Sequence, residues 1–587
     1  MTAGADVAPT PEEHGLFVLS GSVLTHPARG DAASRVVAQA PPDALSVVTD
    51  PDPAGPPTVI RTALAAWESI PASATHHLIV QDDMLLTGTL FERARMAIEA
   101  MPAAALALFS LWDSRNGAAV RLGALSGARW VGAVNEYTPC AALILPRDVA
   151  AGYVDYVRRH PRTWPEDILM YRYLRSVKVP CLVSVPNLAE HEDVPSIAGN
   201  AFRGPRRSAC FLRSDRPGGE HSRLTGLTAV PFFKNGVAQC VVRIEGTAPA
   251  RWLHLETVDY LSGLGVPSRD LQPRLGRPMS GVDPAVVNGT WLTSYAMGMA
   301  TGNTIQDTDP AVVAEALRTV AAGGMSHDSP AWRISEAQGL LAQVAELGMW
   351  AGREAVPRPR RTGFGITVLG GEGPFGEHLV RALTDRGHPV TVVSTSPPGG
   401  ARPGVRYAIT RTHPMSEDRN AVLDLRQLVP GQATAAARTV IVGPRGTGRE
   451  ALRLDAGHLY GPGCGPDSVI GAMVWAALQS KPILISDGTP DVVRPRHVRE
   501  LAELVCAAVG ENDDAPAPAP EYPVRELAEI IAQVVRPTPV HDHRTTTPAA
   551  PALVESGRRQ GDLRYRLHHF AQWLAYEIEA TDPAAIT

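Results

Sequence analysis

The sequence predicts an α/β protein in which two separate sheet domains are joined by a mixed middle region and followed by a helical tail. Strand-like and helical segments alternate from about residue 15 to residue 200, which is the pattern of an α/β sheet. The Pro/Arg-rich stretch VPRPRRTG (356–363) interrupts the pattern as a linker would. A second strand, glycine-rich turn and helix then follow in GITVLGGEGPFGEHLVRAL.

The composition indicates a soluble globular protein of several domains, because 587 residues exceed what one core holds and the hydrophobic fraction is 44%. A net charge of -5 gives no reason to expect a nucleic-acid partner. The apolar runs are shorter than the roughly 20 residues of a membrane span. The N-terminus lacks the pattern of a signal peptide, and the six cysteines have no metal-like spacing. We therefore expect no membrane span and a cytoplasmic location, in an actinobacterial or similar high-GC background.

The first predicted domain covers residues 14–205. Its expected strands are 15–26, 43–50 and HHLIV, with helices in TVIRTALAAWESI, DVAAGYVDYVRRH and PEDILMYRYLRSV. The middle region, 206–355, carries a long helical pattern, PAWRISEAQGLLAQVAELGMW, and is otherwise unassigned.

Two adjacent carboxylates, Asp82 and Asp83, follow the apolar run HHLIVQ. Ligands of open α/β sheets collect at the carboxyl ends of the strands. Carboxylates there suit a hard divalent cation that also bridges to phosphates. The alternative is that one aspartate caps the turn while the other is solvated.

Further polar residues stand at comparable places along the same domain. Arg29 and Asp50 follow the first two strands, and His191 lies in the polar segment LAEHEDVPSIAGN. Glu166 and Asp167 begin a helix, where acidic residues are favoured by the helix dipole alone. Each residue has an ordinary structural explanation by itself, so the order of the whole set carries the functional hypothesis.

This order resembles that of the GT-A glycosyltransferases over residues 14–202. The resemblance implies that Asp82 and Asp83 of QDD match the motif that holds Mn²⁺ or Mg²⁺ on the donor diphosphate. His191 matches a metal-contacting histidine, and Arg29 and Asp50 match nucleotide contacts. QDD departs from a strict DxD motif, so either aspartate could be the metal ligand.

The resemblance also implies a chemistry, which is displacement at the anomeric carbon of a nucleotide sugar. The metal would neutralise the leaving diphosphate. Glu166 or Asp167 would take the proton of the acceptor hydroxyl if the reaction inverts. The donor sugar, the acceptor and the stereochemical outcome stay open.

The second predicted domain, 363–510, carries Gly370, Gly373 and Gly376 between a strand and a helix. Glycines at such a turn let the backbone approach a pyrophosphate at the helix N-terminus. Together with LYGPG and RHVREL, this segment resembles the extended short-chain dehydrogenases, the NAD(P)-dependent epimerase/dehydratase family with a Rossmann-like, doubly wound sheet.

The catalytic part of that family is missing from the second domain. The family uses a Tyr-x-x-x-Lys pair before the YGPG element, and ARTVIVGPRGTGREALRLDAGH contains neither residue. This absence argues against a working oxidoreductase. A domain that still binds NAD(P) or a nucleotide sugar, and a purely structural or dimerisation domain, are both left open; a homodimer is one expectation.

The sequence thus predicts a metal-dependent glycosyltransferase that uses a nucleotide sugar and a small-molecule or cell-surface acceptor. The alternatives are an NAD(P)-dependent nucleotide-sugar epimerase or dehydratase, and a non-enzymatic scaffold that binds nucleotide ligands. A Pro-rich linker and two helices are expected over 511–587.

Overall fold

The protein is described by a computed structural model. The described residues are 17–134, 136–160, 164–192, 194, 204–244, 251–275, 281–302, 308–356, 365–371, 374–385, 387–394, 405–409, 421–425, 438–442, 452–455, 457–509, 519–544 and 557–576. The chain forms two compact units, here called unit 1 (Met1–Cys240 with Gln272–Ala355) and unit 2 (Val241–Leu271 with Val356–Thr587). The middle region of the sequence therefore divides between them.

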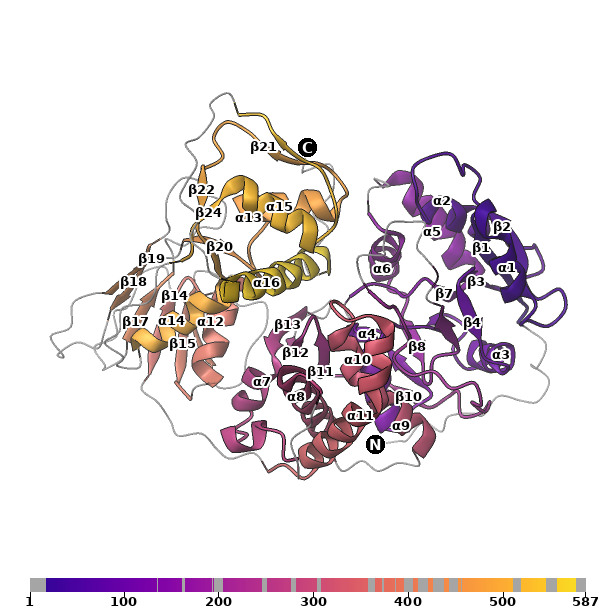
Figure 1. Ribbon diagram of the computed structural model, residues 1–587, viewed down its shortest axis with the longest axis horizontal. Helices are drawn as coiled ribbons and strands as arrows, with labels where there is room; N and C mark the ends of the chain where they lie inside the picture. Colours follow the sequence, from indigo (N-terminus) through magenta and orange to yellow (C-terminus); the bar gives the residue numbers. More distant parts are fainter. Residues whose placement is uncertain are drawn as a thin grey trace. The chain divides into compact units, whose positions relative to one another are not determined.

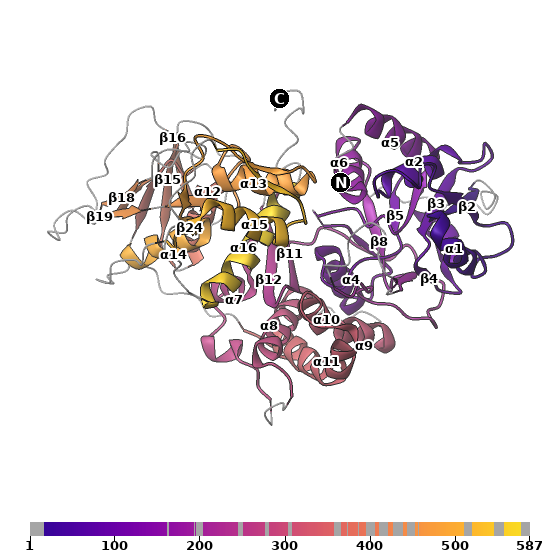
Figure 2. The same ribbon diagram turned by 45° about the horizontal axis from the view of Figure 1, so that its top comes forward.

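The first part of unit 1 is an eight-stranded mixed sheet, with helices that appear in Figures 1 and 2. Its elements are β1 (Leu19–Thr25), η2 (Pro27–Arg29), α1 (Gly30–Val37), β2 (Ser46–Thr49), α2 (Ile60–Glu68), β3 (His76–Gln81), β4 (Met84–Leu86), α3 (Leu90–Ala100), β5 (Ala105–Ala107), α4 (Arg115–Leu125), β6 (Trp130–Gly132), β7 (Ala142–Pro146), α5 (Arg147–Arg159), α6 (Glu166–Ser176), β8 (Cys181–Ser184), β9 (Ala189–His191) and β10 (Arg223–Leu224). The predicted strands and helices of this region are confirmed with shifted ends.

The strand order of this sheet is β10-β6-β8-β5-β7-β3-β1-β2. β1 is parallel to both β2 and β3, with Leu24 beside Gln81, whereas β7 is antiparallel to β3 and β5. The chain leaves β3 through Asp82 and Asp83, and β4 then pairs with β9 in a separate two-stranded ribbon. The carboxyl ends of β1, β2 and β3 therefore lie at the same edge.

Both faces of β3 are covered, which explains why HHLIV is an almost continuous apolar run. Leu78 and Val80 join a core with residues of α1 and α3. His77 points to the other face, where its ring meets that of Trp67 on α2 at 5.9 Å.

The rest of unit 1 is formed by β11 (Ala229–Lys234), β12 (Val237–Ile244) as far as Cys240, α8 (Pro284–Thr301), α9 (Pro310–Arg318), α10 (Val320–Met325) and α11 (Ala331–Arg353). α8, α10 and α11 lie side by side in both views. A Cβ at Gly352 would meet the carbonyl oxygen of Tyr295 at 1.9 Å, so glycine is required for α11 to approach α8 this closely. The long helix predicted for the middle region is confirmed as α11.

Unit 2 contains β13 (Arg251–Glu256), α7 (Thr257–Gly263), η4 (Ser268–Leu271), β14 (Ile366–Leu369), α12 (Pro374–Asp385), β15 (Val390–Ser394), β16 (Val405–Ile409), β17 (Ala421–Asp424), β18 (Arg438–Val442), β19 (Leu452–Asp455), β20 (His458–Tyr460), α13 (Val469–Leu478), β21 (Ile483–Ile485), β22 (Val492–Val493), β23 (Pro495–His497), α14 (Val498–Val509), β24 (Tyr522–Pro523), α15 (Val524–Val534), β25 (Val540–Asp542) and α16 (Gly557–Tyr576). The two helices predicted for the tail are confirmed as α15 and α16.

The main sheet of unit 2 has the order β16-β15-β14-β17-β18-β19. Its first four strands are parallel and the segment β14–α12–β15 is Rossmann-like. β18 is antiparallel to both of its neighbours, β17 and β19, so the sheet departs there from the parallel doubly wound order that the sequence predicts. The stretch between β15 and β20 is short for the usual alternation of strands and helices, which agrees with this change.

No helix within the described ranges combines the length and the apolar character that crossing a bilayer requires.

Candidate functional site

Four of the site residues predicted for unit 1 meet at the carboxyl ends of β1 and β3. Arg29 Nη1 donates to Asp82 Oδ1 at 3.1 Å and to Asp83 Oδ2 at 3.4 Å. His191 Nε2 lies 3.5 Å from the same Asp83 oxygen. We call Arg29, Asp82, Asp83 and His191 the acidic cluster.

Local structure explains why these side chains converge. Thr25, the last residue of β1, donates its hydroxyl to Asp82 Oδ2 at 2.7 Å, and Asp82 N donates to Leu24 O at 3.1 Å. Pairing of Met84 with His191 in the β4–β9 ribbon brings the histidine back to the turn. The cluster is thus assembled by three segments that are distant in sequence and close in the fold.

The acidic cluster is largely buried, with Asp82 5%, Asp83 8% and His191 8% exposed. Asp83 Oδ1 is buried and makes no hydrogen bond with the described residues. A buried carboxylate oxygen without a partner is costly, and in native sites it often marks the place of an ion or ligand.

Asp50, the fifth residue of the predicted donor site, follows β2 at the same sheet edge but is bound elsewhere. Arg61 donates two hydrogen bonds to Asp50, from Nε to Oδ1 at 3.1 Å and from Nη2 to Oδ2 at 2.9 Å. The hydrogen bond from Arg61 lowers the pKa of Asp50, which keeps the carboxylate ionised. In this arrangement Asp50 orders the loop after β2.

The predicted catalytic pair, Glu166 and Asp167, begins α6 in different surroundings. Glu166 is buried, and burial followed by the charge of Asp167 raises the pKa of Glu166 to about 8. Asp167 Oδ1 accepts from Ile168 N at 2.9 Å, and its backbone oxygen accepts from Thr138 N at 3.1 Å. Glu166 is therefore mostly protonated at neutral pH.

Sequence reasoning missed a further buried carboxyl group, Glu136, in the loop between β6 and β7. It accepts hydrogen bonds from Arg115 N at 2.9 Å and Asn116 N at 3.3 Å, at the N-terminus of α4. Burial raises the pKa of Glu136, although Lys234 and Arg115 oppose the shift. Nothing in the sequence distinguishes Glu136 from an exposed loop glutamate.

The glycines of unit 2 lie as the motif predicts where they are described. Gly370 directly follows β14 with φ +73°, a conformation that favours glycine. A Cβ at Gly376 would meet the carbonyl oxygen of Gly371 at 2.4 Å, so the turn and α12 need glycine there. Gly373 lies outside the described residues. Tyr460, of the YGPG element, is buried beside Phe570 and His497 and belongs to the core.

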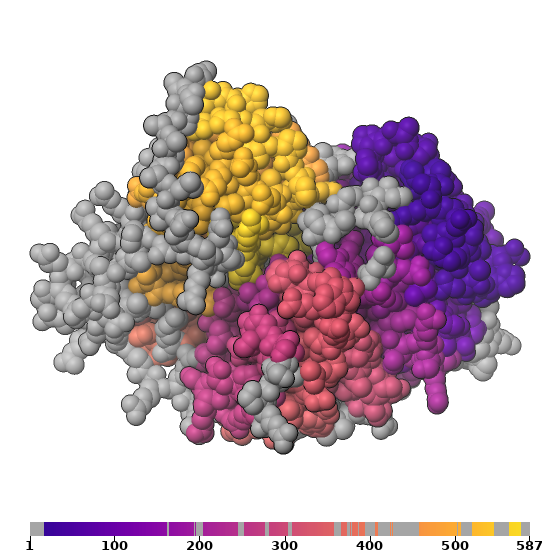
Figure 3. Space-filling view, in the orientation of Figure 1, coloured from indigo at the N-terminus to yellow at the C-terminus, as the bar shows by residue number. Residues whose placement is uncertain are grey.

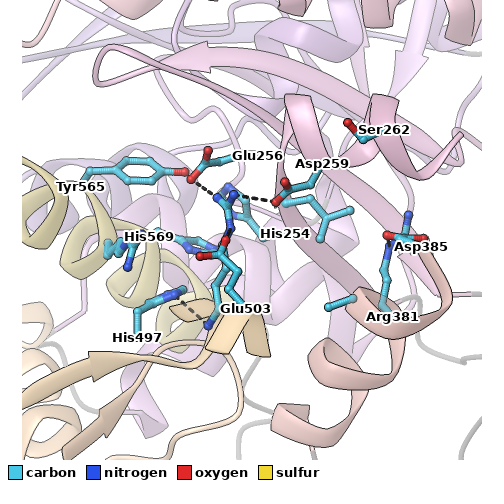
Figure 4. A pocket seen from close by; sticks show the side chains of 14 residues that line it. His254, Glu256, Asp259, Ser262, Arg381, Asp385, His497, Glu503, Tyr565 and His569 are labelled. Carbon is cyan, nitrogen blue, oxygen red and sulfur yellow. Dashed lines mark hydrogen bonds and ion pairs between the residues drawn. The ribbon is translucent and has the colours of Figure 1, made fainter. Parts of the chain in front are cut away.

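A cavity of about 270 Å³ in unit 2 is the second place where polar side chains converge (Figure 4). Rings of His254 from β13 and His569 from α16 lie 3.5 Å apart, and His497 lies 5.6 Å from His569. Arg499 pairs with Asp259 at 2.7 Å, with Glu503 at 2.9 Å and also with Glu256. The positive charge of Arg499 is thus compensated by protein carboxylates.

Among the side chains that the structure describes, no group of three or more His, Cys, Asp or Glu residues is arranged to hold a metal ion. The protein side chains of the acidic cluster thus do not complete the predicted metal site by themselves.

Comparison with known proteins finds no matching family model and no matching curated protein. Solved structures that match include a UDP-glucose 4-epimerase of Thermus thermophilus complexed with NAD, at 13% identity over 36% of this chain and 98% of that chain, with a TM-score of 0.23. MoeE5 in complex with UDP-glucose and NAD matches at 18% identity over 36% and 99%, with a TM-score of 0.24. The UDP-glucose 4-epimerase of Thermotoga maritima with UDP-glucose matches at 11% identity over 37% and 100%, with a TM-score of 0.24.

Two of these three structures are named as UDP-glucose 4-epimerases, and the third contains UDP-glucose and NAD. Identities of 11 to 18% and TM-scores of 0.23 to 0.24 are too low to assign an activity to this chain.

Proposed function

We propose that unit 1 is a glycosyltransferase domain that transfers a sugar from a nucleotide-sugar donor to a small-molecule or cell-surface acceptor. One observation supports this above the others: at the carboxyl ends of the parallel strands β1 and β3, Arg29 contacts both Asp82 and Asp83, and His191 contacts Asp83. That edge is where α/β sheets bind their ligands. Asp50 at the end of the neighbouring strand would border the same donor.

The charges of the acidic cluster support a cation as part of the site. Two carboxylates face one guanidinium, which leaves negative charge in excess when His191 is neutral, so a diphosphate alone would be repelled. Asp83 Oδ1 and His191 would hold Mn²⁺ or Mg²⁺, and donor phosphates would supply further ligands, as is usual for Mg²⁺. A bound ion would neutralise the charge of the leaving diphosphate.

The acceptor step is assigned to the start of α6. Because Glu166 is mostly protonated at neutral pH, we favour Asp167 as the member of the pair that accepts the proton of the acceptor hydroxyl if the reaction inverts. Glu166 would then donate a hydrogen bond, as a carboxyl group held neutral by burial can.

A second candidate function belongs to unit 2, namely binding of NAD(P) or a nucleotide sugar at the turn before α12, as in an epimerase or dehydratase. The conformation of Gly370 and the tight contact at Gly376 favour it. The segment ARTVIVGPRGTGREALRLDAGH still lacks the tyrosine and lysine that the reaction needs. Binding without oxidation is therefore the form of this candidate that the residues support.

A thermal-shift panel on the full chain separates the two candidates. Nucleoside diphosphates with Mn²⁺, the same ligands with a chelator, and NAD or NADP are each added. The first proposal predicts that at least one diphosphate raises Tm only with Mn²⁺. A rise with dinucleotide and with no diphosphate would replace it by the second.

A further inference from the structure

The exposed face of α11 carries a stripe of large apolar side chains. Trp332 is 63% exposed, Leu340 45%, Leu347 48% and Trp350 45%. At roughly 3.6 residues per turn these four lie within an arc of about 80°, in which the exposed Glu336 and Gln343 also lie. The opposite face of α11, with Ile334, Leu341 and Met349, is buried.

This concentration is unusual within the described part of the chain. Outside α11 and Val356, which follows it, the exposed large apolar side chains are Val18, Val47, Val177, Leu264 and Leu484, each on a different element or loop. Exposed apolar side chains gathered on one face mark an interaction surface, whereas single exposed residues are ordinary. α11 reaches the surface at the lower centre of Figure 3.

The stripes of two copies of α11 are complementary when the two helices run antiparallel. Leu340 lies as far before the midpoint between Gln343 and Val344 as Leu347 lies after it. Two antiparallel copies of α11 centred there would therefore place Leu340 against the partner's Leu347. The same alignment puts Trp350 at the level of the partner's Ala337, a small residue.

The charges follow the same symmetry. Arg333 lies as far before the midpoint as Glu354 lies after it, and both are exposed on the side of α11 that bears the stripe. Within the described residues, neither Arg333 nor Glu354 has an ion-pair partner. An antiparallel pair of helices would form two Arg333–Glu354 ion pairs, one at each end.

We propose that α11 is the contact surface of a homodimer in which two copies of this chain pair α11 antiparallel about a twofold axis. This dimer does not depend on the proposed function. A twofold interface uses one patch on both partners and must be self-complementary, as this stripe is. Helices packed in this way approach to about 8–10 Å, within reach of leucine and tryptophan side chains.

The test is the mass in solution of the full chain and its charge-swap variants, measured by light scattering after size exclusion or by sedimentation. Wild type should have twice the mass of one chain. Arg333→Glu and Glu354→Arg should each weaken the dimer at least tenfold, because each places like charges together at both ends. An equimolar mixture of the two variants should regain the dimer, since the mixed dimer forms one ion pair with reversed sign and one with the wild-type sign.

Two further variants distinguish a specific loss of the dimer contact from a general loss of solubility or folding. Leu347→Asp should yield a folded monomer, whereas Val177→Asp, an exposed apolar residue after α6, should stay dimeric. A monomeric wild type, or a dimer that Leu347→Asp does not weaken, would overturn the proposal. A mixture of the two charge variants that remains monomeric would overturn the antiparallel alignment.

Discussion

At the scale of single residues, the start of α6 shows how burial changes the pKa of one of two neighbouring carboxyl groups, that of Glu166. Glu166 is buried, and its Oε1 atom makes no hydrogen bond with the described residues. Burial raises the pKa of Glu166 to about 8. An unfolded glutamate titrates near 4.3. Between about pH 4.3 and pH 8 the folded chain therefore binds a proton that the unfolded chain has lost.

This difference sets the sign of a pH dependence. Because the folded state binds more protons in that window, its stability falls as pH rises through it and levels off above about pH 8. Glu166→Gln has no proton to lose, so its stability relative to wild type should grow by up to about 1.4 kcal/mol per pH unit. Melting temperatures of both proteins from acidic to mildly alkaline pH measure this. A difference in Tm that stays constant over the range would contradict it.

At the scale of elements, α3 is held by a buried ion-pair network. Arg93 is fully buried and pairs with Asp215 at 2.7 Å and Glu220 at 2.8 Å, while Trp130 Nε1 donates to Glu220 at 2.6 Å. Removing one member of such a network leaves charges buried without their partner, which costs far more than the net value of the pair.

Arg93→Met should therefore destabilise unit 1 by about 3–5 kcal/mol. Arg95→Met is the matched control on the same helix, because Arg95 is exposed and its pairing with Glu99 at 3.7 Å is worth less than about 1 kcal/mol. Chemical denaturation of both variants gives the comparison. Equal losses of stability would show that the network does not act as described.

The turn before α12 provides a second prediction at this scale. A Cβ at residue 376 would lie 2.4 Å from the Gly371 carbonyl oxygen, and backbone cannot move aside as a flexible side chain can. Gly376→Ala should destabilise unit 2 by about 1–3 kcal/mol. Gly339→Ala on α11, where a Cβ meets nothing within 4 Å, should instead gain about 0.5–1 kcal/mol. Thermal unfolding of the two variants tests this, and a harmless Gly376→Ala would contradict the tight turn.

At the scale of the whole molecule, the two units could be predicted only in part. Alternation of apolar runs and polar turns was sufficient for β1, β3, α5 and α6. The boundary between Ala355 and Val356 coincides with the start of the Pro/Arg-rich linker that the sequence predicts. The boundary inside β12 could not be predicted, because the sequence reads there as an uninterrupted strand.

The candidate site and its surroundings could likewise be predicted only where the pattern is local in the sequence. Asp82 and Asp83 could be predicted because their side chains follow a strand directly. Arg93 and Glu220 could not, since 127 residues separate them and a helix arginine usually points to solvent. Contacts over such distances depend on the folded arrangement and leave no local pattern.

The account as a whole depends on the acidic cluster as a diphosphate site, and calorimetric titration tests that claim most directly. Nucleoside diphosphates are titrated in Mn²⁺ into wild type, Asp83→Asn, and the control Asp31→Asn, which removes an exposed carboxylate from the first turn of α1. We expect wild type and Asp31→Asn to bind at least one diphosphate alike, and Asp83→Asn to bind it at least tenfold more weakly. Equal binding by all three proteins, or no binding by wild type, would contradict the proposed site.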